Sequence, residues 1–158
     1  MEPVAENLVE KTWQEVALFS PETLDKEMVI MSKNQPDLLA FLMAYTEDLP
    51  QEARELSVYL AFVIYQIFQG SQKKIPKISS KEIVGCYQEN ELFLKAQGKL
   101  IDRIADVRFS RQPYVMKYVV DALMEVSGEG DNIELSEEDK GFIFVLLKTI
   151  TEVLDRKL

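Results

Sequence analysis

Carboxylates are the side chains in this sequence whose spacing best fits catalytic or metal-binding chemistry. Two acidic groups each stand near an expected helix start: Glu47, Asp48, Glu52 and Glu55, and Glu134, Glu137, Glu138 and Asp139. Carboxylates that converge between helices can hold Mg²⁺ or Mn²⁺, which would require Glu52, Glu55 or Glu138 to face acids on another helix. Acids are also favoured at helix N-termini, because they interact well with the helix dipole. We expect this second role, and a carboxylate-metal enzyme remains an alternative function.

The chain contains no histidine and only one cysteine, which excludes most other catalytic sites. No Ser-His-Asp triad, Cys-His pair, His-ligated metal site or internal disulfide can be built from this chain alone. Cys86 stands in an apolar helical pattern, so we expect a buried thiol without catalytic use. Neither Gly-rich phosphate-binding fingerprint occurs. The sequence therefore predicts a protein that is not an enzyme, with no cofactor and no bound metal.

Basic residues are concentrated in the middle of a chain whose net charge is −9. Residues 71–111 contain 9 basic and 5 acidic residues, whereas residues 1–70 contain 4 and 12 and residues 112–158 contain 5 and 10. Four lysines of this middle part are candidates for a binding surface: Lys73, Lys74, Lys77 and Lys81. No aromatic residues interleave them for base stacking, and the acidic flanks would repel phosphate. We expect them to offset the acidic parts within the fold or at a dimer contact, and not to bind nucleic acid.

Two tyrosines, Tyr59 and Tyr65, are candidates for lining a ligand pocket between helices. They belong to an expected helix at about 49–69, whose centre, residues 58–65, is apolar all round. Aromatic side chains with a hydroxyl group often line ligand cavities. Such tyrosines more often belong to the core, with the hydroxyl group reaching the surface. A small-molecule binding or sensing domain is therefore the first alternative function.

Helical periodicity extends through nearly the whole chain, without a convincing strand pattern. Helix starts are marked by capping serines or by prolines suited to the first turn: Ser20-Pro21, Pro36, Pro50, Ser79 or Ser80, Pro113 and Ser136. A further short helix is expected at about 100–107. At this length folding buries roughly 70% of the unfolded chain's surface, so the core needs no disulfide or metal. We predict an all-α fold, a single domain over 1–158 that forms a compact bundle of seven or eight helices.

Part of the sequence occurs twice. Residues 35–42 resemble residues 112–119, and the apolar helix that follows resembles residues 135–153. We predict two pseudo-repeated four-helix units, about 5–70 and 80–158, joined by a basic linker at 71–81, in which the most apolar helices form the core or the contact between the units. The pattern is similar to helical-repeat arrays such as HEAT repeats, although no motif assigns a family. The alternative is that two amphipathic helices share apolar positions without duplication.

These observations favour a non-enzymatic protein-interaction or regulatory module that acts through helical surfaces. The two long apolar helices suit association with a protein partner or with a second copy in a homo-dimer. The acidic N-terminus does not resemble a signal peptide. The longest nearly apolar run, residues 58–68, is shorter than the roughly 18–20 residues that a membrane span needs. We therefore expect no membrane association and, with a single cysteine, a cytoplasmic location.

Overall fold

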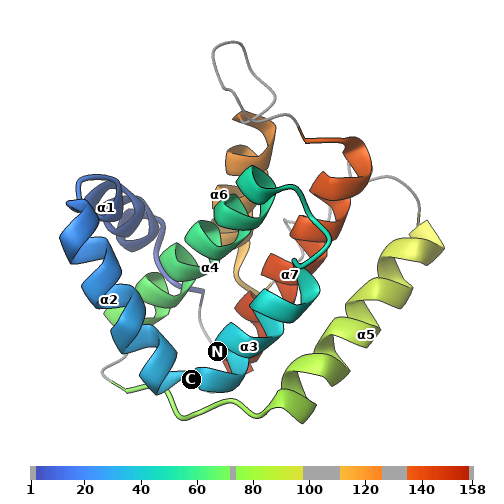
Figure 1. Cartoon of the computed structure of the whole chain (residues 1–158), viewed down its shortest axis with the longest axis horizontal. Helices are drawn as coiled ribbons and strands as arrows, with labels where there is room; N and C mark the ends of the chain where they lie inside the picture. Colours follow the sequence, from blue (N-terminus) through green and yellow to red (C-terminus); the bar gives the residue numbers. More distant parts are fainter. Residues whose placement is uncertain (1–2, 72–73, 98–110, 126–134, 157–158) are drawn as a thin grey trace.

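The computed structural model of the chain describes residues 3–71, 74–97, 111–125 and 135–156 (Figure 1). Within these ranges it contains seven helices and no strand: α1 (Glu6–Ala17), α2 (Pro21–Asn34), α3 (Pro36–Tyr45), α4 (Gln51–Ser71), α5 (Ser80–Gln97), α6 (Pro113–Glu125) and α7 (Glu137–Arg156). The predicted all-α bundle is confirmed. The short helix expected at about 100–107 lies outside the described residues.

Five of the described helices begin at the serines or prolines that the sequence indicated. At the starts of three helices a serine Oγ atom accepts a hydrogen bond of 3.0 to 3.2 Å from a backbone N–H group. These serines are Ser20 at α2, Ser79 at α5 and Ser136 at α7. Pro36 and Pro113 are the first residues of α3 and α6. Because the first N–H groups of a helix have no acceptor within it, these residues fix where each helix starts.

The two longest of the described helices, α4 and α7, pack against each other at the centre of the bundle. In Figure 1, α1 and α2 lie on one side of this pair and α5 lies on the other. Their inward-facing side chains are almost completely buried: Leu60, Ile64 and Phe68 from α4, and Leu146, Ile150 and Leu154 from α7. Most of their apolar surface is therefore used inside the protein, and the first half of α4 is the main part that borders the open surface described below.

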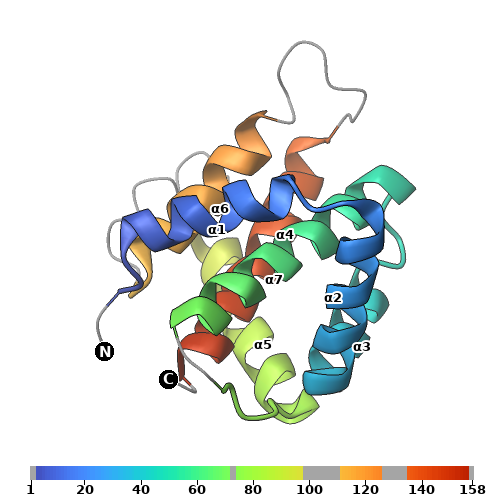
Figure 2. The same ribbon diagram turned by 90° about the vertical axis from the view of Figure 1, so that its left-hand side faces the viewer.

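Two outer helices cover this centre in matching ways. Helix α1 packs against α4 and α6, and α5 packs against α7 and α3. Figure 2 shows α1 crossing α4 and α6. Val9, Thr12 and Val16 in α1 have the same spacing as Ile83, Cys86 and Asn90 in α5, where Tyr87 is buried as well. Each outer helix thus contacts the long helix of its own predicted unit and the short helix of the other unit.

Two buried glutamines, Gln35 and Gln112, tie extended segments to the starts of α3 and α6. The Oε1 atom of Gln35 accepts a hydrogen bond from Ile78 N at 3.0 Å, and its Nε2 atom donates one to the backbone carbonyl of Pro76. The Oε1 atom of Gln112 accepts from Val4 N at 2.8 Å, and its Nε2 donates to Asp155 Oδ1 at 2.8 Å. These parallel contacts agree with the predicted pseudo-repeats, although the duplication itself stays a prediction.

Candidate functional site

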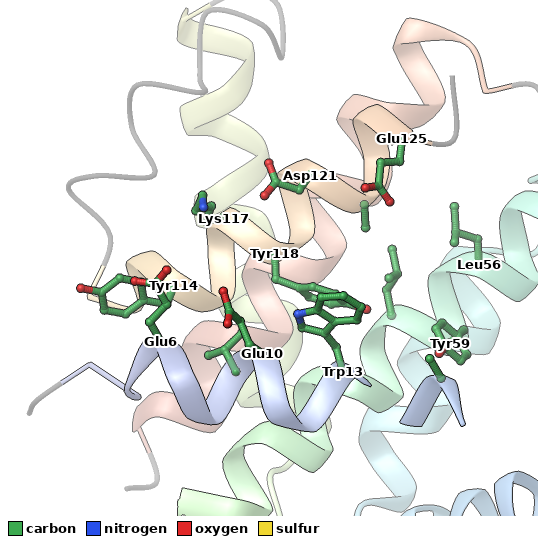
Figure 3. Close-up of a pocket in the computed structure, with 14 residues that line it drawn as sticks. Glu6, Glu10, Trp13, Leu56, Tyr59, Tyr114, Lys117, Tyr118, Asp121 and Glu125 are labelled. Carbon is green, nitrogen blue, oxygen red and sulfur yellow. The ribbon is translucent and has the colours of Figure 1, made fainter. Parts of the chain in front are cut away.

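A pocket of about 380 Å³ opens between α1, α4 and α6 (Figure 3). We call it the α6 pocket. Four aromatic side chains contribute to its wall: Trp13 from α1, Tyr59 from α4, and Tyr114 and Tyr118 from α6. The rings of Trp13 and Tyr118 are stacked, with centroids 6.2 Å apart and an interplanar angle of 20°. Large rings of limited flexibility offer broad contact area, so this wall is suited to binding an apolar or cationic group.

Acidic side chains surround the α6 pocket. Figure 3 shows Glu6 and Glu10 on α1, and Asp121 and Glu125 on α6, around the aromatic wall. All four are exposed. Among the described residues of the lining, Lys117 is the one basic residue, so acids outnumber bases by four to one. The pocket therefore presents an apolar wall with a negative rim, which attracts cations.

A second pocket, of about 640 Å³, adjoins the first and is formed by α2, α3, α4 and the turn between α3 and α4. We call it the α2 pocket. Its wall is mostly aliphatic and contains two methionines: Leu24, Met28, Met43, Leu49 and Val58. Tyr59 lines both pockets, so they are neighbours along the first half of α4. Together they form what we call the α4 groove.

The charged residues of the α2 pocket are Asp25, Glu55 and Arg54. The Nη2 atom of Arg54 donates a hydrogen bond to the backbone carbonyl of Met43 at 3.1 Å. Its Nε atom is buried and has no hydrogen-bond partner among the described residues. Asp25 and Glu55 are exposed, so the excess of acidic side chains continues from the α6 pocket into the α2 pocket.

Exposed apolar side chains border the α4 groove. Met43 and Tyr114, which line it, are 45% and 38% exposed. Leu24, Met28 and Val58, which also line it, are half-buried. Single exposed apolar residues are ordinary, whereas several gathered around a concave surface indicate a binding site.

Tyr59 and Tyr118 of the groove remain uncharged at neutral pH. Burial raises the pKa of Tyr59 above its usual value. Burial also raises the pKa of Tyr118, and the nearby Tyr59 and Glu125 contribute further to this rise. Both phenol groups can therefore donate hydrogen bonds to a ligand, but neither is activated as a phenolate nucleophile.

The two tyrosines singled out from the sequence lie in different places. Tyr59 is half-buried in the α4 groove. Tyr65 is only 2% exposed, and its hydroxyl oxygen accepts hydrogen bonds from Asn34 Nδ2 at 3.1 Å and from Gln69 Nε2. Tyr65 is therefore a core residue with a satisfied hydroxyl group, and it lines neither pocket.

The three predicted lysines that the structure describes, Lys74, Lys77 and Lys81, are not brought to the α4 groove. Lys74 and Lys77 are exposed on the segment between α4 and α5, and Lys81 is exposed in the first turn of α5. None of the three lines either pocket. Lys73 lies outside the described residues. The structure thus separates these lysines from Tyr59.

The carboxylates considered for metal binding face solvent. Glu52, Glu55 and Glu138 are all exposed. Across the part of the chain that the structure describes, no three acidic or cysteine side chains are placed to hold a metal ion. Glu134 lies outside that part. The inward-facing arrangement that a carboxylate-metal enzyme would require is therefore not seen at Glu52, Glu55 or Glu138.

Sequence reasoning missed most of the groove. Glu6, Glu10 and Trp13 follow each other at helical spacing on one face of α1, and Tyr114, Lys117, Tyr118, Asp121 and Glu125 do so on α6. These two mixed aromatic and acidic faces are a signal that the sequence carries. The contact between α1 and α6, which places them around one pocket, depends on tertiary packing and has no local signal.

None of the helices in the described ranges combines the length and the apolar character that crossing a membrane requires. This finding agrees with the absence of a long apolar run in the sequence. Comparison of the chain with models of protein families, with curated proteins and with solved structures finds no match. The arguments on function that follow therefore rest on the geometry of the α4 groove.

Proposed function

We propose that the protein is a non-enzymatic interaction module that binds a partner protein through the α4 groove. The observation that carries this proposal is the groove itself, an aromatic and aliphatic concave surface that is open to solvent beside an almost completely buried core. Exposed residues such as Met43 and Tyr114 belong to its lining. Covering such a surface gains roughly 25 cal/mol for each Å² of apolar area removed from water.

The chemistry of the groove supports binding more than catalysis. Tyr59 and Tyr118 are held in their protonated forms. The thiol of Cys86 is buried and does not line either pocket. A nucleophile next to a base, which covalent catalysis needs, is not found in the described lining.

A small-molecule site within the α6 pocket is the second candidate. Its volume of about 380 Å³ falls within the roughly 300–1,000 Å³ that is common for ligand sites. A lone small ligand would leave the adjoining α2 pocket and the exposed Met43 uncovered. The extent of the groove therefore favours a larger occupant.

Site-specific photo-cross-linking in living cells of the source organism tests the proposal. A benzophenone amino acid replaces Tyr114, which is 38% exposed in the groove, or Leu92, a control residue on α5 that is 68% exposed. We expect protein adducts from position 114 that position 92 does not give. No adduct from position 114, or the same adducts from both positions, would contradict the proposal.

A further inference from the structure

We infer that the occupant of the α4 groove is a basic amphipathic helix of the partner protein. This inference rests on the proposed function, since it names the partner chemistry of the same site. It is carried by three features of the groove, namely the sign of its charge, the secondary structure of its walls and the division of its apolar surface into two adjoining pockets.

Charge selects a basic partner. The two linings together contain six acidic residues and two basic ones, Lys117 and Arg54. All six acidic side chains are exposed, so they lie where a partner's lysines and arginines can stay at the edge of the interface in contact with water. Opposite charges at an interface speed association and disfavour the wrong partner. An acidic peptide or an anionic lipid surface would be repelled.

The walls of the groove favour a helix over an extended peptide. They are built mainly from helices, whose backbone groups bond within each helix, and the described residues include no strand edge to which a peptide could add. An extended peptide would leave its own N–H and C=O groups unpaired against an apolar wall, at about 1–3 kcal/mol for each buried group. A helix satisfies these groups internally, as helices that bind in grooves do.

Two adjoining pockets that share Tyr59 suit the stripe of apolar residues on one helix face. Side chains at positions i, i+3 or i+4, and i+7 of a helix form a stripe that can enter adjoining pockets. One apolar side chain of the partner would enter the α6 pocket beside Trp13, and another would enter the α2 pocket beside Met28. Methionine side chains adapt their shape to a guest, and aromatic faces attract nearby lysine or arginine.

A second copy of this chain is a poorer fit to the groove. Contact between the grooves of two copies would bring two acidic rims together, and each copy carries a net charge of −9. Like charges that face each other across an interface weaken it by several kcal/mol. The charge of the groove therefore points to a different and basic protein.

Three synthetic peptides without tryptophan test the inference on the full-length protein. The first two share one stripe of leucines and differ in the flanking residues, which are lysine and arginine in one and glutamate in the other. The third carries the same basic charge on a proline-rich sequence that cannot form a helix. Trp13 is the only tryptophan of the chain and lines the α6 pocket, so its fluorescence reports binding directly.

We expect the basic helical peptide to bind at least about ten-fold more tightly than either of the other two, and to weaken as salt is added. The variants Glu10→Lys and Glu125→Lys should each weaken this binding by about ten-fold. Glu89→Lys makes the same charge change at an exposed residue of α5 outside the groove. This control should change the affinity for the basic helical peptide less than two-fold. All three variants alter exposed side chains, so folding is kept.

The outcomes separate this inference from the proposed function. The inference would be overturned if the acidic helical peptide or the proline-rich peptide bound as tightly as the basic helical peptide. The groove would then still be a protein-binding site. Protein adducts at position 114 with no peptide binding would also overturn it alone. If neither adducts nor peptide binding are observed, both the inference and the proposed function fail.

Discussion

The thiol of Cys86 lies between α5 and α7, where burial raises its pKa from 9.0 to about 11. The negative charge of Glu152 adds to this rise, while Arg156 and Lys148 oppose it. The Sγ atom lies 4.0 Å from the backbone oxygen of Thr149. At neutral pH the thiol is therefore protonated and shielded, as expected for a cysteine with a packing role.

The raised pKa of Cys86 makes stability depend on pH in the alkaline range. Between about pH 9 and 11 the folded chain holds a proton that the unfolded chain releases, so the free energy of unfolding should fall as pH rises through this window. We expect urea denaturation of Cys86→Ala to show a smaller decline from about pH 8 to 10 than the wild type. The comparison uses slopes, because the smaller side chain also lowers stability at every pH. Equal slopes would show that the thiol does not contribute.

At the scale of elements, the buried glutamines fasten helix starts to distant segments. Gln112 joins the first turn of α6 to the end of α7, through Asp155, and to the N-terminal segment, through Val4. Asp155 also pairs with Arg111, whose Nε lies 3.3 Å from its Oδ2. Among the described residues, the side chain of Gln35 bonds only backbone groups of the segment before α5. The two sites thus share their geometry, but a buried carboxylate is present at one of them.

This difference predicts unequal losses of stability. Gln112→Leu removes the hydrogen bonds that the side-chain amide makes with Val4 N–H and the Asp155 carboxylate. We expect the free energy of unfolding to fall by about 3 kcal/mol. Gln35→Leu leaves only neutral backbone groups, and we expect about 1–2 kcal/mol. The exposed Gln14→Leu serves as a control that should stay within about 0.5 kcal/mol. Urea denaturation measures all three, and equal losses at Gln112 and Gln35 would contradict the role of the carboxylate.

Local elements of this protein could be predicted from the sequence, whereas the groove could not. Ser20, Pro36 and Pro113 mark helix starts through backbone chemistry that acts within one turn. Tyr59 and Tyr65 occupy the same apolar helix. Their residue type and their apolar neighbours in the sequence give no reason to expect different locations. They stand on different faces of α4, and whether a face is covered depends on which helices pack there. That information lies in contacts between segments far apart in the chain.

At the scale of the whole molecule, part of the acidic charge gathers around the α4 groove. Six acidic residues of the chain line the α4 groove, which is also where apolar side chains are open to solvent. An uncharged groove of this kind would favour contact between copies, because covering apolar surface is favourable. The acidic rim opposes such contact while leaving the walls free for a basic partner.

This balance can be tested by neutralising the rim. The triple variant Glu10→Gln, Asp121→Asn, Glu125→Gln keeps the apolar walls and removes three negative charges from the α6 pocket. We expect the wild type to sediment as a monomer and this variant to form dimers as its concentration rises, because the repulsion between facing rims is weaker. The control triple Glu22→Gln, Glu89→Gln, Glu138→Gln removes three charges outside the groove and should stay monomeric. If both triples sedimented alike, the position of the acidic residues around the groove would have no part in association.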